Sequence, residues 1–347
     1  MSAHADPLRL ASFNTELSRK GPGLLLRDIL KQTDDVIAVA RVITHINPHI
    51  IALQDIDYDA DNIALTALAD LLREYGADFP YVFSLRPNTG RITGLDMDGD
   101  GKLGEAQDAQ GYGRFAGDGG MGLLSKFPIQ SESVQDYSNL LWKDLPNANL
   151  PKVDGKLFPS SEVLNIQRLS TTGHWIVPIS ISQNTTFSAL MFHATPPVFD
   201  GPEDRNGLRN HDEITMWSEI LDGKLGAEIG SDFAILGTTN LDPVDGEGLH
   251  TAMTALLSHP KLHDPQPSSI GAIQNADPSH QGPAAHDTVD YKGPGNLRVD
   301  YVLPSSNMTV TGSGVFWPDP AISDILGPDS MAAGRHRLVW VDVILDR

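Results

Sequence analysis

The sequence of 347 residues contains no cysteine, so neither a disulfide framework nor a thiolate metal site can form. Basic residues are also scarce, because 25 Lys and Arg stand against 45 Asp and Glu, for a formal net charge of −20. Nonspecific nucleic-acid binding depends on clustered Lys and Arg, so this balance disfavours a polyanion partner but leaves open a nuclease with a locally positive cleft. No stretch approaches the roughly 18 to 20 consecutive apolar residues of a membrane span, so we expect a soluble protein.

The first ten residues, MSAHADPLRL, lack the positive n-region and the apolar segment of a signal peptide. Two explanations stay open: a cytoplasmic protein, or a periplasmic or extracellular one whose signal peptide has been removed and replaced by an added Met. The polar, Ala-rich lead before the first apolar run favours the second explanation.

Apolar runs bounded by turn residues predict about ten strands and only three or four helices. The expected strands lie near residues 8–13, 49–55, 81–85, 121–129, 174–181, 187–193, 233–238, 297–304, 310–317 and 338–345. We expect a helix that begins near residue 24, has a second start signal at residue 33 and runs to about residue 46. Helical spacing and caps predict further helices at about 62–75, 209–222 and 251–257. A doubly wound parallel sheet would need more helices, so we predict an α+β fold, a four-layer αββα sandwich of two mostly antiparallel sheets. No internal repeat or interior linker is evident, so we expect a single domain over residues 1–347.

Several apolar runs reach a polar residue of metal-binding or acid/base type at or near their C-terminal end. These residues are Asn14, Asp55, His193, Asn240 and Asp242, with Asp300 inside a further run. A polar group buried in a strand costs about 1 to 3 kcal/mol unless it is paired. Taken singly, Asn14 could be a turn former, Asp55 a helix cap and His193 a satisfied core histidine. Their recurrence predicts instead that these side chains converge on a site at one edge of the sheets.

The same residues carry a family resemblance over roughly residues 8 to 345. The matching stretches, in order, are SFNTE, LQDIDYD, GMGLLSKFPI, HATPPVFDGPEDRNGLRNHDE, GTTNLDPVDG, LRVDYVLP and RHRLVW. In this order they resemble the endonuclease/exonuclease/phosphatase superfamily, the fold of DNase-I-like nucleases, sphingomyelinases and inositol-phosphate phosphatases. The sequence is most similar to the secreted bacterial members.

The resemblance implies a role for each matching residue. Asn14 and Asp55 would bind a divalent cation, with Mg or Mn expected, since hard cations prefer oxygen ligands. Asp300 would hold His336 in one tautomer while that imidazole orients or deprotonates the attacking water. His193 and Asn240 would hydrogen-bond the phosphoryl oxygens, and Asp242 would cap the turn that follows it.

Three positions depart from the family pattern. Asp55 replaces the usual Glu, Arg335 stands where many members place an Asp, and Thr238 stands where the motif G-D-x-N-x-D has its first Asp. The loss of two carboxylates weakens a divalent site, so either one metal held mainly by Asp55 remains or Arg335 binds the phosphate in its place. A Thr238→Asp substitution would raise metal affinity and turnover in a weakened site, and would lower stability in a repurposed one.

A second acidic segment, LDMDGDGKLGEAQD, has the spacing of a calcium loop. Asp96, Asp98 and Asp100 occupy its first, third and fifth positions, and Lys102 the seventh, but Gln107 replaces the bidentate Glu. A structural Ca²⁺ site and a solvated acidic turn are both open.

Further basic residues have the same ambiguity. Arg205, Arg209 and His211 could line the cleft beside His193 or form a surface salt-bridge cluster. Arg114 and Tyr112, in GYGRF, could reach the cleft or be structural. We count Arg335, Arg209 and Arg114 as candidate substrate-binding residues.

The combined pattern favours a metal-dependent phosphoester hydrolase, a phosphodiesterase or phosphatase acting on small-molecule or lipid-headgroup phosphoesters. We expect a monomer. Two alternatives stay open: a nuclease, and a catalytically impaired or repurposed binding protein on the same fold.

Overall fold

The structure of the protein is a computed structural model that describes residues 7–317 and 333–345. Its helices are α1 (Leu24–Lys31), α2 (Asp34–Ile46), α3 (Ile63–Glu74), α4 (Ser161–Leu164), α5 (Arg205–Leu221), α6 (Thr251–Leu257) and α7 (Ile270–Gln274). The starts of α1 and α6 agree with the sequence prediction, whereas α5 begins at Arg205, earlier than predicted. None of the helices in the described part of the chain combines the length and hydropathy that a membrane crossing requires.

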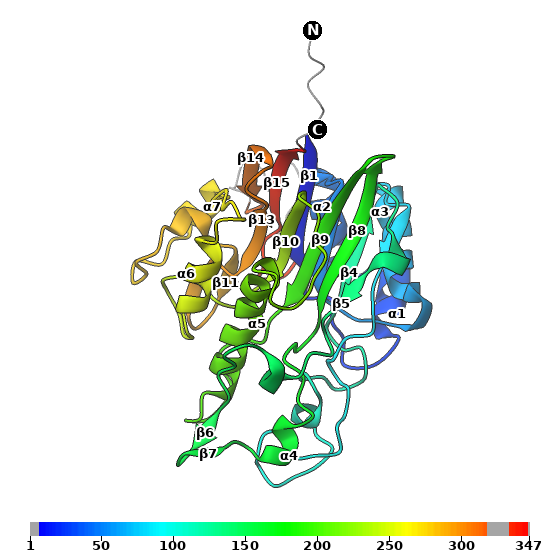
Figure 1. The fold of residues 1–347 in the computed structure, drawn as a ribbon. Helices are drawn as coiled ribbons and strands as arrows, with labels where there is room; N and C mark the ends of the chain where they lie inside the picture. The colour runs from blue at the N-terminus through cyan, green and yellow to red at the C-terminus, as the bar shows by residue number, and fades with distance from the viewer. Residues whose placement is uncertain (1–6, 318–332, 346–347) are drawn as a thin grey trace.

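Two sheets form the centre of the molecule (Figure 1). The first contains, in spatial order, β14 (Thr309–Val315), β15 (Val339–Ile344), β1 (Leu8–Asn14), β2 (Ile50–Ile56), β4 (Gly120–Ser125) and β3 (Tyr81–Phe83). The second contains β13 (Asp300–Pro304), β10 (Phe233–Thr238), β9 (Thr185–His193), β8 (His174–Ser182) and β5 (Gln135–Asp136). Within each sheet one strand pair is parallel, β1 with β2 and β10 with β9, and the other pairs are antiparallel.

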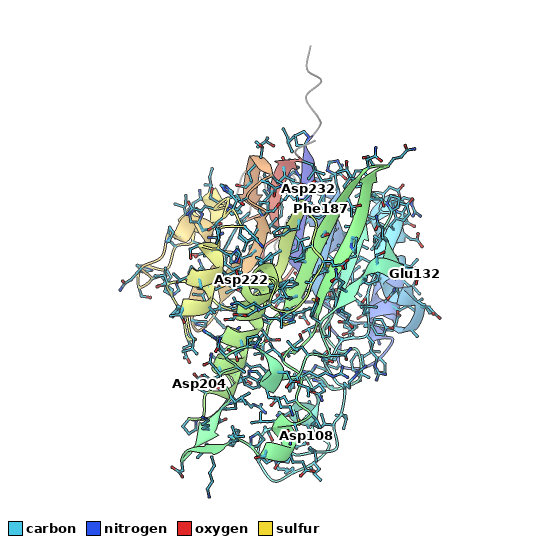
Figure 2. The ribbon with its side chains drawn as sticks, viewed as in Figure 1. Asp108, Glu132, Phe187, Asp204, Asp222 and Asp232 are labelled. Atoms are coloured by element: carbon cyan, nitrogen blue, oxygen red, sulfur yellow. The ribbon has the colours of Figure 1, made fainter. Side chains whose placement is uncertain are left out.

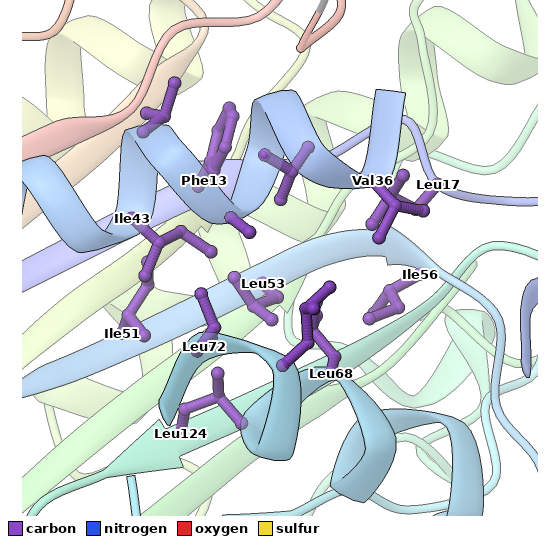
Figure 3. Packing of buried hydrophobic residues seen from close by; sticks show 14 of the residues in the cluster. Phe13, Leu17, Val36, Ile43, Ile51, Leu53, Ile56, Leu68, Leu72 and Leu124 are labelled. Carbon is purple, nitrogen blue, oxygen red and sulfur yellow. The ribbon is translucent and has the colours of Figure 1, made fainter. Parts of the chain in front are cut away.

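Three hydrophobic clusters separate the layers. Because side chains alternate along a strand, Leu10 of β1 faces the second sheet, whereas Ala11 and Phe13 face α1, α2 and α3. Figure 3 shows the helix-covered side, where Val36 and Ile43 pack with strand residues. On the far side of the second sheet, Trp217 of α5 and other residues of α5 and α6 cover β9, β10 and β13. The layer order is therefore helix, sheet, sheet, helix, and the predicted fold class is confirmed.

Long connections extend beyond the sheets at one end. The segment between β3 and β4, helix α4 and a hairpin of β6 (Lys152–Val153) with β7 (Lys156–Leu157) lie in the lower part of Figure 1. A second short hairpin, β11 (Val289–Tyr291) with β12 (Gly295–Leu297), precedes β13. The sequence analysis treated these regions as loops, because strands of two or three residues are too short to show an alternating pattern.

Candidate active site

A cavity of about 290 Å³ opens where β1, β2, β9 and β10 end. Its lining includes the predicted residues Asn14, Asp55, Arg114, His193, Asn240, Arg335 and His336. Strand register explains part of this convergence, because Thr238 of β10 pairs with His193 on one side and with Asp300 on the other. Residues that are far apart in the sequence are thereby aligned in one row across the second sheet.

His336 and Asp300 form a buried pair behind the cavity. Nδ1 of His336 lies 2.8 Å from Oδ2 of Asp300. A carboxylate can only accept hydrogen bonds, so Nδ1 carries the proton of this contact, and Nε2 lies on the opposite side of the ring from Asp300. The Asp300 carboxylate also accepts hydrogen bonds from the hydroxyls of Thr238, at 2.6 Å, and Thr288, at 3.0 Å. The imidazole is therefore fixed in the orientation that a general base requires.

The position of Thr238 accounts for one departure from the family pattern. Its side chain is fully buried, and its hydroxyl donates to Oδ1 of Asp300 instead of facing the cavity. Thr238 therefore supports the His336–Asp300 pair and offers no ligand to a cation.

Tyr291 is a site residue that the sequence analysis did not predict. Its hydroxyl lies 3.2 Å from Nε2 of His336 and 3.3 Å from Oδ1 of Asn240. Burial raises the pKa of Tyr291, and the nearby Asp300 adds to this effect, so the phenol stays protonated at neutral pH and can donate. No strand-end pattern marks this residue, because β11 is a three-residue strand within a loop-rich segment.

Arg335 forms an ion pair with Glu16 at the edge of the cavity. Nε of Arg335 lies 2.7 Å from Oε1 of Glu16, and the backbone N–H and a terminal nitrogen of Arg335 also donate to the Glu16 carboxylate. Burial alone would raise the pKa of Glu16, but hydrogen bonds from Arg335 lower it below its usual value. The guanidinium carbon also lies 5.3 Å from the centre of the Tyr291 ring. The cation therefore neutralises Glu16 instead of leaving it free to bind a metal.

Asp55 is the acid in the cavity that fits a metal ligand. It sits at a bulge between β2 and β4 with a φ of 51°, and a Cβ at Gly119 would lie 2.9 Å from its Oδ1. Burial raises the pKa of Asp55, and Glu16 and Asp118 add to this effect, although a hydrogen bond from Ser18 opposes it. The carboxylate thus lies beside other acids, in an environment that a bound cation would stabilise.

These donors fit one divalent ion. Asp55 supplies a carboxylate and Asn14 an amide oxygen, the hard ligands that Mg²⁺ and Mn²⁺ prefer. Among the described residues, the groups of three His, Asp or Glu close enough to share an ion include none in this cavity. A cation held by Asp55 and Asn14 would therefore need water or substrate oxygens to complete its coordination.

His193 and Asn240 line the wall opposite Asp55. Burial lowers the pKa of His193 to about 4, and the nearby His336 adds to this effect, so the ring is neutral at neutral pH. Its Nδ1 is buried and has no hydrogen-bond partner among residues 7–317 and 333–345. Asn240 donates from Nδ2 to the Ala194 carbonyl at 2.9 Å, which fixes its amide beside the His193 ring. Both side chains are thus held as neutral polar groups that can bind oxygens of a substrate.

Arg209, for which a substrate-binding role was predicted, is not among the residues that line the cavity. It is buried within α5, and its guanidinium donates to the carbonyls of Leu169, Gln110 and Arg168 at 2.6 to 2.9 Å. All three acceptors lie in connections, so Arg209 holds these segments together. The sequence could not place it, because the face of α5 that it occupies is covered by residues distant in the chain.

One turn further along α5, Glu213 supports the cavity wall. This fully buried carboxylate accepts hydrogen bonds from the backbone N–H groups of Thr171, at 2.5 Å, and Thr195, at 2.7 Å, and both threonines line the cavity. Burial raises the pKa of Glu213 to about 7, and Arg209 opposes this effect. The sequence analysis missed Glu213, because its partners come from two separate loops.

The other basic candidates are divided between the cavity and the surface. Arg114 and Tyr112 line the cavity, so the segment between β3 and β4 forms one of its walls. Arg205 donates to the Met97 carbonyl, and His211 lies 3.0 Å from Asp212, so neither belongs to the lining. Of the three predicted substrate-binding arginines, Arg335 and Arg114 lie at the cavity.

The acidic loop gathers a different set of ligands from the predicted one. Oxygens of Asp96, Asp98 and Asp108 lie within 4.8 Å of one another. Asp108 follows the expected twelfth position by one residue, and Figure 2 places it in the lower extension, well away from the sheets. Asp100 is not part of the group, and its Oδ2 instead lies 2.6 Å from Nζ of Lys102 in an exposed ion pair.

Comparison with protein families gave a match, whereas comparison with curated sequences did not. Residues 11–324 match the Endonuclease/Exonuclease/phosphatase family. None of the curated protein sequences compared with the chain matches it.

Solved structures share the fold at low sequence identity. An endonuclease/exonuclease/phosphatase from Beutenbergia cavernae DSM 12333 is 16% identical, with a TM-score of 0.57 over 98% of this chain and 72% of that chain. A family protein from Leptotrichia buccalis C-1013-b is 15% identical, with a TM-score of 0.53 over 97% and 100% of the two chains. The human Nocturnin catalytic domain with bound sulfate anion is 13% identical, with a TM-score of 0.50 over 100% and 96%. The family match covers most of the sequence, and the chain therefore belongs to the endonuclease/exonuclease/phosphatase family.

Proposed function

We propose that this protein is a metal-dependent phosphoester hydrolase that acts on small-molecule or lipid-headgroup phosphoesters. The observation that carries the proposal is the buried His336–Asp300 pair: His336 lines the same cavity as Asp55, and its second imidazole nitrogen lies beside the Tyr291 hydroxyl. A base and a carboxylate suited to a cation thus lie on one cavity, as hydrolysis of a phosphoester requires. Assignment to the secreted bacterial branch of the family stays a prediction.

The residues of the chain divide the chemical tasks among them. A divalent cation bound by Asp55 and Asn14 would polarise the phosphoester and offset the charge that develops on it. Nε2 of His336 accepts the proton of the attacking water, and Asp300 stabilises the imidazolium that forms. His193 and Asn240 bind phosphoryl oxygens. The Tyr291 hydroxyl contacts both Asn240 and His336 and so fixes the position of the Asn240 amide relative to the imidazole.

The dimensions of the cavity favour a small substrate. Its volume of about 290 Å³ lies near the lower end of the range of about 300 to 1,000 Å³ that is usual for ligand pockets. The net charge of −20 disfavours long polyanions, because a nucleic acid needs an extended basic surface. Arg114 provides positive charge at the cavity itself, where a single phosphate group needs it, whereas the charge of Arg335 is offset by Glu16.

A second function is favoured by one specific observation. Arg335 pairs with Glu16 inside the cavity, and the hydroxyl of Thr238 is occupied by Asp300. A guanidinium in this position could bind a phosphoester without hydrolysing it, so a binding protein on the same fold is the alternative.

Hydrolysis of bis(p-nitrophenyl) phosphate and p-nitrophenyl phosphate with Mg²⁺, Mn²⁺ or Ca²⁺ tests the proposal. A general base contributes roughly 10²- to 10⁴-fold, so His336→Ala should lose at least about 100-fold in kcat. His259→Ala is a matched control, because this histidine lies 3.3 Å from Asp222 and outside the cavity lining. Activity that is equal in wild type and His336→Ala would contradict the hydrolase proposal, whereas saturable phosphoester binding without turnover would support the alternative.

A further inference from the structure

A second cavity, of about 170 Å³, lies beside α6 and the connection that follows it. Its polar lining residues include Asp242, Asp287 and the Arg298–Asp264 ion pair. Val244 and Leu257 are among its apolar lining residues. The volume is about five to six times the ~30 Å³ that one water molecule occupies in the liquid, so the cavity has room for a small organic molecule.

The acids that line the cavity are paired, except for one. Asp242 accepts hydrogen bonds from the backbone N–H groups of Val244, Asp245 and Arg298 at 2.7 to 2.9 Å. Asp264 accepts two hydrogen bonds from the Arg298 guanidinium at 2.6 and 2.8 Å. These contacts give the carboxylate oxygens of Asp242 and Asp264 hydrogen-bond partners.

Asp287 has no such compensation. The residue is only 8% exposed, it lines the cavity, and its carboxylate has no partner in the part of the chain that the structure describes. Burial raises the pKa of Asp287 to about 7; Asp242, Asp245 and Asp277 add to this effect, and His280 opposes it. A buried carboxylate without a partner is unfavourable, because desolvation is not repaid by a hydrogen bond or an opposite charge.

We propose that this cavity binds a small organic ammonium ion, whose N–H groups donate to Asp287 and whose hydrocarbon part packs against Val244 and Leu257. An ammonium supplies both the positive charge and the donors that the Asp287 carboxylate lacks. A bare metal ion fits less well, because the groups of three possible ligands found among the described residues include none at this cavity. The combination of one unpaired acid and apolar lining residues is the chemistry that recognises an organic cation.

The second cavity is separate from the active site but shares backbone segments with it. Asn240 faces the first cavity and Asp242 the second, within one turn after β10. Thr288, the residue after Asp287, donates its hydroxyl to Asp300. The proposal rests on the second cavity alone and does not depend on the hydrolase assignment.

Calorimetric titration of the full chain at pH 8 tests the proposal with three probes: 1,4-diaminobutane, ethanolamine and choline. Wild type should bind at least one of them saturably at constant ionic strength. The isosteric variant Asp287→Asn should weaken that binding at least tenfold, because it removes the charge that the ammonium contacts. Asp144→Asn is the matched control, since Asp144 is exposed and outside the cavity lining, and its affinity should stay within twofold of wild type.

Thermal melting supplies a second readout that does not depend on the choice of probe. Without ligand at pH 8, Asp287→Asn should melt at a higher temperature than wild type, because it removes an unpaired buried charge. Three results would overturn the proposal: no saturable binding of any probe, equal affinity in Asp287→Asn, or a lower melting temperature of that variant without ligand. A saturable response to MgCl₂ that Asp287→Asn abolishes, in place of a response to the amines, would make the cavity a metal site and would also overturn it.

Discussion

Thr238→Asp should lower the stability of this protein rather than restore a metal ligand. The sequence alone slightly favoured a gain of metal affinity for this change, because the other site residues, His336, Asp300, His193 and Asn240, are all present. In the structure the Thr238 hydroxyl donates to Oδ1 of Asp300 at 2.6 Å, and both side chains are buried. A carboxylate at position 238 would therefore face a second carboxylate, and the donor that stabilises Asp300 would be lost.

The size of the effect follows from these contacts. Loss of a hydrogen bond to a charged acceptor costs about 1.5 to 3 kcal/mol. Two unit charges about 3 Å apart repel by roughly 5 to 6 kcal/mol at an effective dielectric constant of about 20, although the pair can escape part of this cost by sharing a proton. We expect the free energy of unfolding to fall by about 3 to 6 kcal/mol at pH 8, a large part of the roughly 5 to 15 kcal/mol that stabilises a folded protein.

Urea unfolding of wild type, Thr238→Asp and Thr238→Ser at pH 5 and pH 8 measures this loss. The shared proton raises the folded-state pKa of the acid pair above its unfolded value, so the penalty should grow as the pH rises from 5 to 8. Thr238→Ser keeps the hydroxyl and should stay within about 1 kcal/mol of wild type. If Thr238→Asp were as stable as Thr238→Ser at pH 8 and bound Mg²⁺ more tightly than wild type, the inferred role of Thr238 would be refuted.

Three further predictions concern positions around the cavity and in the acidic loop. Tyr291→Phe should lower kcat by about tenfold or more with little change in melting temperature, because it removes the hydroxyl between His336 and Asn240 without removing the ring; an unchanged kcat would exclude the positioning role. Burial raises the pKa of Glu213 from 4.5 to about 7, so the folded wild type loses stability as the pH rises from about 4.5 to 7. The difference in the free energy of unfolding between wild type and Glu213→Gln, measured in urea, should therefore shrink between pH 5 and pH 8. A difference that does not change with pH would argue against the raised pKa of Glu213. Calcium should raise the melting temperature of wild type relative to chelator-treated protein, as binding to the folded state requires, and Asp98→Ala should abolish the shift if the loop of Asp96, Asp98 and Asp108 is responsible.

The sequence was sufficient for the features that depend on short-range patterns. Apolar runs that end at Asn14, Asp55 and His193 predicted that these side chains meet at one edge, because strands of a packed sheet bring their ends together. Asp242 caps the turn that follows it, also as predicted, by accepting from the N–H groups of Val244 and Asp245.

The features that the sequence could not provide depend on partners from distant segments. Arg209 shows the same helical spacing whether its face meets solvent, substrate or a loop, and only the tertiary structure brings the carbonyls of Gln110 and Leu169 to it. Tyr291 reaches His336 through a short hairpin with no periodic pattern. Asp108 joins the acidic loop one residue beyond the expected spacing, because the backbone curls so that Met97 N–H donates to its carboxylate.

The pairing of β1 between β15 and β2 has a consequence for protein synthesis. Leu8 of β1 lies opposite Val343 of β15, so β1 keeps one unpaired edge until β15, more than 300 residues later, has been translated. An exposed edge is a template for wrong pairing, so chaperone binding to the nascent chain should be strongest before β15 emerges. His336 lies only a few residues before β15. His336, the proposed base, and the strand that pairs with β1 therefore leave the ribosome together, and a nascent chain that lacks β15 should show no hydrolase activity.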